Sequence, residues 1–214
     1  MPRAEDTQSN APVKLYRNPK SGHCHRVELM LSLLSVPYEC VDLDMSNGAH
    51  KAPDYTRISP LGQVPAIDDN GVTLSDSNAI ITYLADRYDN LDDWFGSTPA
   101  ERAEVQRWLS IAAGEVFRGP CSARLVTVFG AQLDHDAAKA TAHNLFRVMD
   151  EHLLNREWLA AGRCTLADIA GYSYIAHAPE GGVPLSSYSN IRAWLERIEA
   201  LPGFVGMARS PVPA

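Results

Sequence analysis

The residues best suited to chemistry lie close together near the start of the chain, in the stretch NPKSGHCHRVEL from residue 18 to 29. Cys24 stands between His23 and His25, and Ser21 precedes it by three residues. These residue types permit a nucleophilic thiolate or a metal site. The spacing is also that of a C-x-x-C redox motif in which serine replaces the first cysteine, and this replacement removes the dithiol cycle.

A metal site is not expected at this stretch. Consecutive residues point about 100° apart on a helix, so the side chains of His23, Cys24 and His25 cannot converge on one ion. The other three cysteines, at positions 40, 121 and 164, are scattered and match neither a disulfide framework nor a zinc motif. We therefore expect a reducing, cytoplasmic setting.

The whole chain has 214 residues, enough for one large domain or two modest ones. Its net charge of −7, without a cluster of Lys or Arg, argues against nucleic-acid binding. No apolar run is long enough to span a membrane. The polar residues 1–12 show no secretory signal and are expected to form a disordered arm.

Two kinds of pattern divide the rest of the chain. Strand and helix patterns alternate over residues 13–88 in the order β-α-β-α-β-β-α, with a hairpin turn at Asn70-Gly71. Only helical patterns remain over residues 98–214, and the first helix opens with a capping box at Thr98. Gly119-Pro120 is expected to end that helix, and residues 89–97 to link the two parts. The sequence therefore predicts a small α/β domain followed by an all-helical domain.

Two segments of the α/β part carry special residues where an element begins. Pro65, in GQVPAI, belongs at the first residue of a strand, because proline cannot donate a hydrogen bond within a sheet. A trans bond is commoner before proline, whereas a cis bond would turn the main-chain groups of Val64 outward. Asp76 and Ser77 open the next helix, where they can cap it or can help its exposed N–H groups to bind a carboxylate.

Taken together, these motifs resemble those of the glutathione transferase family, from residue 13 to about residue 207. TLADIAGYSY and NIRAWLERIEALPGF resemble the helical domain of that family. The resemblance implies a thioredoxin-like domain followed by an all-α domain, a homodimer, and glutathione as a co-substrate with no further cofactor. It is nearest to bacterial, serine-type members close to the theta and beta classes.

The resemblance also implies roles for individual residues in binding glutathione. Val64, before a cis Pro65, would pair with the cysteinyl part of the ligand as an added strand does. Asp76 would hold the ligand's ammonium group, and Ser77 its glutamyl carboxylate. The residues implied at the glycyl end are His50, Lys51 and Gln63.

Ser21 would face the glutathione sulfur and donate a hydrogen bond to it, with Asn18, His23 and Cys24 as alternatives. The residues expected around the second substrate, a small apolar electrophile, are Tyr16, Phe117, Arg124 and Tyr172, although ordinary helix packing explains the last three equally well. Two other functions stay open: a glutathione-dependent peroxidase or disulfide reductase, and a non-catalytic glutathione-binding regulator. Asp168, by contrast, has capping-box spacing with Thr165 and is predicted to be structural.

Overall fold

The first part of the chain folds as the β-α-β-α-β-β-α pattern predicts. The computed structural model describes residues 11–213, so the expected disordered arm, residues 1–12, lies almost wholly outside the described residues. The elements of this part, in chain order, are β1 (Val13–Arg17), α1 (Gly22–Leu33), β2 (Tyr38–Asp42), η1 (Ala49–Lys51), α2 (Pro53–Thr56), β3 (Ala66–Asp69), β4 (Val72–Ser75) and α3 (Ser77–Tyr88).

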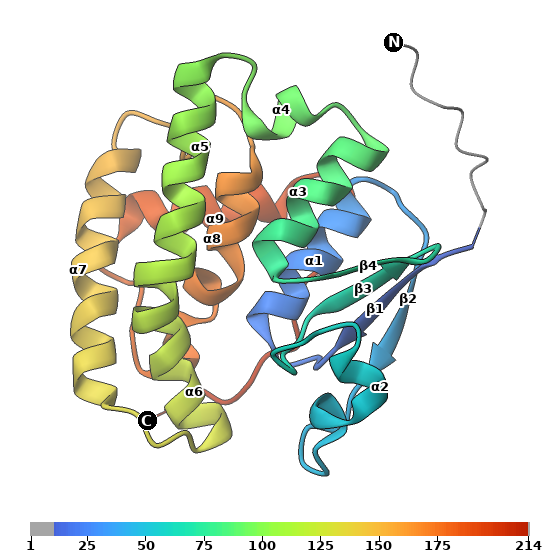
Figure 1. Ribbon diagram of the computed structural model, residues 1–214. Helices are drawn as coiled ribbons and strands as arrows, with labels where there is room; N and C mark the ends of the chain where they lie inside the picture. The colour runs from blue at the N-terminus through green and yellow to red at the C-terminus, as the bar shows by residue number, and fades with distance from the viewer. Residues whose placement is uncertain (1–10, 214) are drawn as a thin grey trace.

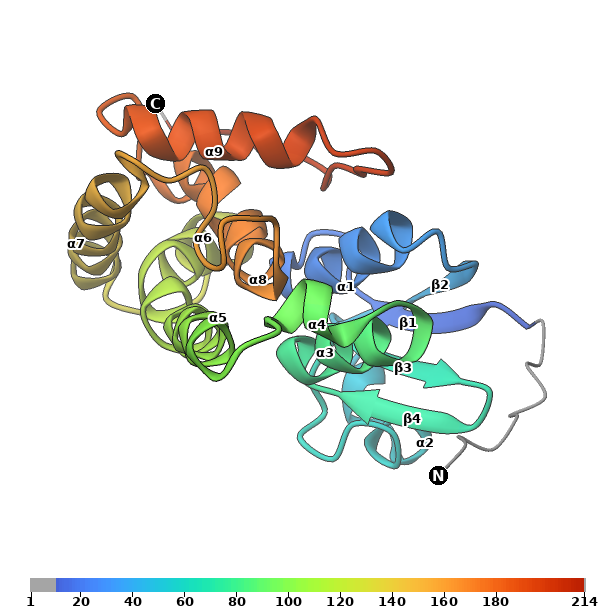
Figure 2. The same cartoon turned by 90° about the horizontal axis from the view of Figure 1, so that it is seen from above.

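A mixed four-stranded sheet of order β2-β1-β3-β4 forms the centre of this domain. β1 pairs in parallel with β2, and β3 runs antiparallel to both β1 and β4. α1 and α3 cover one face of the sheet, and α2 lies on the other side (Figure 1, Figure 2). Asn70 and Gly71 close the β3–β4 hairpin with φ angles of +52° and +91°, the geometry that favours this dipeptide in tight hairpins. The thioredoxin-like arrangement is confirmed.

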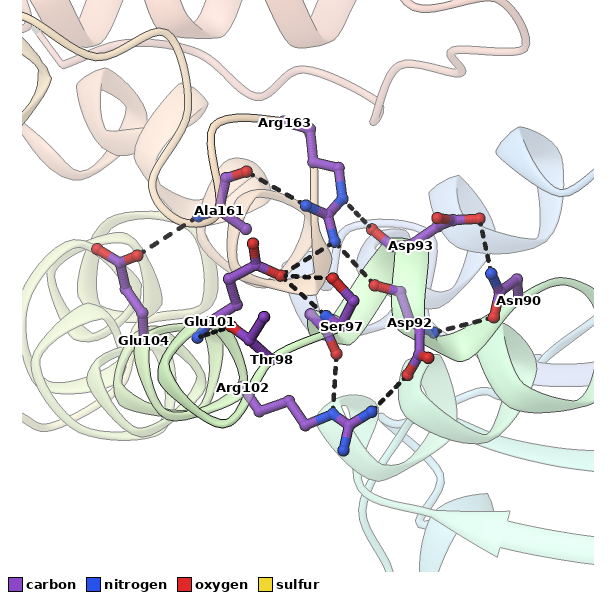
Figure 3. A network of polar contacts seen from close by, with 11 residues as sticks. Asn90, Asp92, Asp93, Ser97, Thr98, Glu101, Arg102, Glu104, Ala161 and Arg163 are labelled. Atoms are coloured by element: carbon purple, nitrogen blue, oxygen red, sulfur yellow. Dashed lines mark hydrogen bonds and ion pairs between the residues drawn. The ribbon is translucent and has the colours of Figure 1, made fainter.

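The segment expected as a linker, residues 89–97, contains the short helix α4 (Leu91–Phe95) and is held at both sides (Figure 3). Arg102 donates to the Asp92 carboxylate at 2.6 Å. Arg163 donates to two main-chain carbonyls of α4 at 2.8 and 3.0 Å. The link between the two domains is therefore a fixed joint.

The second part of the chain is helical in the described residues. Its elements are α5 (Pro99–Ile111), the π-helical segment η2 (Ala112–Cys121), α6 (Ser122–Phe129), α7 (His135–Leu153), α8 (Leu166–Ala176), η3 (Ala178–Gly181) and α9 (Ser189–Glu199). α8 lies at the centre, packed against α5 and η2 and, across the domain boundary, against α1. The predicted all-helical second domain is confirmed.

The expectation that Gly119-Pro120 ends the first long helix is wrong. The chain stays helical through Pro120, because the wider turns of η2 take up a residue that lacks an N–H and that an α-helix would exclude. Gly119 serves packing instead, since a Cβ there would lie 2.9 Å from the main-chain nitrogen of Ala142 on α7. The glycine thus lets η2 and α7 approach closely.

Both predicted capping residues are at helix starts. Thr98 Oγ1 accepts a hydrogen bond from the Glu101 N–H at 3.3 Å, while the Glu101 carboxylate accepts from the N–H of Ser97, one residue earlier than the capping box predicts. Asp168 is fully buried and completes a capping box with Thr165 at the start of α8. The structural interpretation of Asp168 is confirmed.

Candidate active site

A cavity of about 260 Å³ lies where the two domains meet. Three segments of the first domain form one side of it: the start of α1, the loop before β3 and the start of α3. The second domain contributes the π-helical segment η2. The lining residues are His23, Arg26, Gln63, Val64, Pro65, Asp76, Ser77, Asn78, Ala113 and Phe117.

The loop before β3 contains a cis peptide bond between Val64 and Pro65, as the family resemblance implies. Two buried side chains fix this loop by bonding to Gln63, the residue before Val64. Tyr55 donates its hydroxyl to the Gln63 carbonyl at 2.7 Å, and Ser59 Oγ donates to the same carbonyl at 2.9 Å. The main-chain groups of Val64 therefore have a defined place at the edge of the cavity.

Asp76 caps α3 in a backbone conformation that side chains rarely adopt, with φ at +75°. A non-glycine residue held at positive φ is strained, and such strain concentrates at functional sites. Asp76 Oδ1 accepts from the N–H groups of Asn78 and Ala79 at 3.0 Å each. The other oxygen, Oδ2, bonds to none of the described residues and leaves a negative charge at the cavity.

His50 and Lys51 lie in η1 and do not line the cavity, but they pack against the loop that does. Lys51 Nζ donates to the Leu61 carbonyl at 3.0 Å. Gly62 has φ at +58°, and a Cβ there would lie 2.7 Å from the carbonyl oxygen of His50. His50 Nδ1 is buried and has no hydrogen-bond partner among the described residues. The main chain of His50 and the side chain of Lys51 thus lie against Leu61 and Gly62, directly before the cavity-lining Gln63.

Ser21 is the N-cap of α1, and its Oγ accepts from the Cys24 N–H at 3.4 Å. The Ser21 hydroxyl also lies beside the Cys24 thiol and, as a hydrogen-bond donor, lowers the pKa of that thiol in part. Ser21 is not among the residues that line the cavity. Cys24 is 1% exposed, and burial raises the pKa of its thiol to about 11, so the thiol is protonated at neutral pH. The Asn18 side chain accepts from the Lys20 N–H at 2.9 Å and is therefore engaged within its own loop.

The two histidines that flank Cys24 are both drawn into the structure, in different directions. His25 is buried and bonds to Ser173 Oγ and the Val205 carbonyl, both at 2.8 Å, away from the cavity. His23 is half-buried and lines the cavity. Desolvation by burial lowers the pKa of His23 to about 3 and that of His25 to about 4, so neither ring adds a positive charge at neutral pH.

Of the four residues expected around a second substrate, the structure places Phe117 on the cavity wall, with 42% of its surface exposed. Arg124 is 1% exposed and ion-paired with Glu180 at 2.6 Å, and Tyr172 is 3% exposed and donates to Glu199 at 2.9 Å. For these two residues the structure favours the alternative of ordinary helix packing, because both side chains turn into the helical domain. Tyr16 lies edge-on to Tyr55 and does not line the cavity.

Five residues at or beside the cavity were not predicted: Arg26, Tyr55, Ser59, Asn78 and Ala113. Arg26 carried a usable signal, because it stands four residues before Met30 on the apolar face of α1, where a charged residue needs a partner or a ligand. The side chains of Tyr55 and Ser59 bond to the main-chain carbonyl of Gln63. Because every residue type has such a carbonyl, this contact leaves no pattern in the sequence.

The described residues form neither a metal-binding cluster nor a membrane-spanning helix. Within residues 11–213, no three His, Cys, Asp or Glu side chains lie close enough to hold a metal ion. Over the same residues, no helix is both long enough and apolar enough to cross a membrane.

Comparison with known proteins accounts for both domains. Residues 11–86 match the family described as glutathione S-transferase, N-terminal domain, and residues 123–202 match glutathione S-transferase, C-terminal domain. The chain belongs to the glutathione S-transferase family. Glutathione S-transferase 3 of Zea mays is 31% identical to it over 95% of this chain and 96% of the relative. Glutathione S-transferase theta-1 of Mus musculus is 27% identical over 89% of this chain and 84% of the relative.

Solved structures of glutathione S-transferases agree with this fold. A glutathione S-transferase from Pseudomonas fluorescens superposes with a TM-score of 0.86 at 28% identity, covering 92% of this chain and 99% of that one. A delta-class glutathione transferase of Nilaparvata lugens gives a TM-score of 0.81 at 32% identity, with 90% and 91% covered. The chain is thus a glutathione S-transferase, and its relatives bear the names of more than one class.

Proposed function

We propose that this glutathione S-transferase joins the thiolate of glutathione to an electrophilic carbon of a small apolar substrate. One observation carries the proposal: a single cavity brings the Val64–Pro65 loop and the start of α3 together with an exposed aromatic side chain, Phe117, from the helical domain. The first two features suit a peptide with an amino-acid end, and Phe117 suits an apolar partner.

Glutathione would lie along the first domain's side of the cavity. The main chain of Val64 pairs with the cysteinyl unit, as in strand addition. The free Oδ2 of Asp76 holds the ammonium group, and Ser77 with the N-terminus of α3 holds the glutamyl carboxylate. The glycyl carboxylate lies toward His50, Lys51 and Gln63, where the buried, unpaired His50 Nδ1 offers a hydrogen-bonding group.

The reaction needs the thiol in its anionic form. A cysteinyl thiol has a pKa near 8.5, so only a few per cent is ionised at pH 7. The Ser21 hydroxyl donates to the sulfur, and the positive end of α1 lies beside it, and both favour the anion. The thiol proton passes to solvent, a C–S bond forms, and the leaving group departs with the bonding electron pair. Glutathione is the co-substrate, and no further cofactor takes part.

The direct test is calorimetry with glutathione, followed by turnover with a nitro-activated aryl chloride, an organic hydroperoxide and a small disulfide. Conjugation of the aryl chloride as the fastest reaction supports the proposal. Faster turnover of the hydroperoxide or the disulfide would make the protein a peroxidase or a reductase. Binding without turnover of any substrate would make it a glutathione-binding regulator. The buried, protonated Cys24 thiol argues against disulfide chemistry at that residue.

Replacing Asp76 with Ala should weaken glutathione binding by ~1.5–3 kcal/mol, because the ligand's ammonium group loses its charged partner. The variant also loses two capping hydrogen bonds of α3, so Asp76→Asn serves as its control: the amide oxygen can still accept both bonds, but the charge is gone. Calorimetry should show a large loss for both variants. An Asp76→Asn protein that binds glutathione as wild type does would remove the carboxylate from the site.

The protein is expected to be a cytoplasmic homodimer that acts in detoxification, as is common for proteins of this kind. Light scattering at micromolar concentration should give twice the 23.4 kDa of one chain. A mass of one chain at that concentration would contradict the homodimer.

A further inference from the structure

Arg26 is a buried cation on the floor of the cavity. It lines the cavity from α1, yet only 1% of it is exposed. Its Nη1 donates to Ser77 Oγ at 2.7 Å and to Asn78 Oδ1 at 2.8 Å, and its Nη2 donates to the main-chain carbonyl of Ala170 on α8. The guanidinium group is therefore held in one place by both domains.

All of these partners are neutral. No carboxylate of residues 11–213 lies within ion-pair distance of Arg26, and its Nε is buried without a hydrogen-bond partner in the same part of the chain. Desolvation by burial lowers the pKa of Arg26 to about 10, which still leaves the group charged at neutral pH. The Asp76 carboxylate is among the groups that oppose this shift, but it makes no direct bond to Arg26. A buried charge without a directly bonded counter-charge is costly, which favours an anionic ligand beside it.

Ser77 connects this charge to the cavity. An arginine can only donate, so the Nη1 hydrogen is directed at a lone pair of Ser77 Oγ and the serine keeps its own hydrogen to give away. Without a ligand, that hydrogen can go to His23 Nδ1, which lies 3.2 Å from Ser77 Oγ. His23 is neutral, so a carboxylate in the cavity is a stronger acceptor for the same hydrogen.

We propose that Arg26 is a positioning residue that supplies, through Ser77 and the start of α3, the positive charge opposite the glutamyl α-carboxylate of glutathione. This inference rests on the proposed function. In it, the Arg26 guanidinium is the group that makes the glutathione site prefer a ligand with a carboxylate. Asp76, the preceding residue of the same helix start, carries the opposite charge. The site thereby matches both charges of an amino-acid end.

The test compares glutathione with its analogue 4-aminobutyryl-cysteinyl-glycine, which lacks only the glutamyl α-carboxylate. Calorimetry gives the affinity ratio of the two ligands for wild type and for Arg26→Met, whose side chain fills similar space without charge. Lys14→Met is the matched control, because it also removes one positive charge but from an exposed position on β1. Arg26→Lys keeps the charge while losing the guanidinium's fork of donors.

Wild type and Lys14→Met should prefer glutathione over the analogue by about 10- to 100-fold, the range for a hydrogen-bonded charge. Arg26→Met should bind both ligands about equally, and Arg26→Lys should retain part of the preference. A purely structural Arg26 would lower both affinities together and leave the ratio unchanged, and that result would overturn the inference. If Arg26→Met does not fold, Arg26→Lys decides: a preference equal to that of wild type in a protein of lowered stability would also overturn it. Failure of wild type to bind glutathione at all would instead refute the proposed function.

Discussion

Ser21→Ala should lower kcat/KM for conjugation at neutral pH by up to ~10²–10³-fold, the cost of removing one donor to an anion in an enzyme site. The Ser21 oxygen accepts from the Cys24 N–H, and its hydroxyl, which lies beside the buried Cys24 thiol, would turn to the glutathione sulfur when the ligand binds. Without that donor the pKa of the bound thiol rises, and less of it is thiolate at pH 7. Glutathione binding should change little, since Asp76, Ser77 and Val64 remain.

The pH dependence separates this role from a structural one. Above the pKa of the bound thiol in both proteins the sulfur is ionised without help, so the defect of Ser21→Ala should shrink as pH rises. The ultraviolet absorbance of the bound thiolate, titrated for each protein, gives the two pKa values directly. Ser21→Thr is the control, because it keeps both the helix cap and the hydroxyl, whereas alanine also loses a cap that is worth ~1 kcal/mol.

Cys24→Ala offers the opposite comparison. A buried, protonated thiol contributes packing, so conjugation should stay within a few-fold of wild type while stability falls. An inactive Cys24→Ala beside an unaffected Ser21→Ala would reverse the assignment and make this a cysteine-type enzyme that forms mixed disulfides with glutathione.

Asp168→Ala should destabilise the fold by ~3–5 kcal/mol, the range for breaking a buried charged network. The carboxylate accepts from Thr165 N–H and Oγ1, from the Leu159 N–H and from Trp194 Nε1, at 2.8 to 3.1 Å. Alanine would leave these buried donors unpaired between α8, α9 and the segment before α8. Chemical denaturation should show a lower midpoint, with activity of the remaining folded protein unchanged.

Asp134 provides the matched control for that experiment. It is the exposed cap of α7 and accepts one hydrogen bond, from the Ala137 N–H at 2.9 Å, so Asp134→Ala should cost only ~1 kcal/mol. If Asp168→Ala and Asp134→Ala lowered the free energy of unfolding equally, the buried hydrogen bonds of Asp168 would stabilise the fold no more than one exposed helix cap does.

The same carboxylate predicts a pH dependence of stability. Burial, opposed by its four hydrogen bonds, raises the pKa of Asp168 to about 6, above the ~3.9 of an unfolded aspartate. Between these values the folded state binds more protons than the unfolded state, so this group's contribution to stability falls as pH rises from about 4 to 6. Relative to Asp168→Asn, wild type should lose stability over that interval and change little above it.

Local signals predicted most of the fold. The Asn70-Gly71 turn, the N-caps at Thr98 and Thr165, and the apolar periodicity of α1 each depend on residues near in sequence, and each was found where expected. The prediction that Pro120 ends a helix failed, because the rule for proline assumes α-helical hydrogen bonding, whereas η2 has π-helical turns.

The site was predicted less completely, for a different reason. The motifs that line the cavity at Val64–Pro65 and Asp76-Ser77 are contiguous in the sequence, and the structure brings them together. The sequence could not decide between the cavity and helix packing for Arg124 and Tyr172, because the direction of a side chain on a buried helix depends on packing that periodicity does not resolve. Arg26 was missed because its partners, Ser77 and Ala170, lie 51 and 144 residues away.

The hydrogen bond between Arg26 and the Ala170 carbonyl of α8 has a consequence for how such proteins diversify. The helical domain holds the guanidinium with a peptide carbonyl, so any small residue that fits the core at position 170 and keeps α8 helical preserves the acceptor. Phe117 and Ala113, on the same domain, contribute to the cavity through side chains that can change freely. Chimeras that exchange the helical half between relatives should therefore inherit a working amino-acid pocket together with a new substrate repertoire. Whole helical halves can therefore be exchanged where the packing of α8 against α1 is kept.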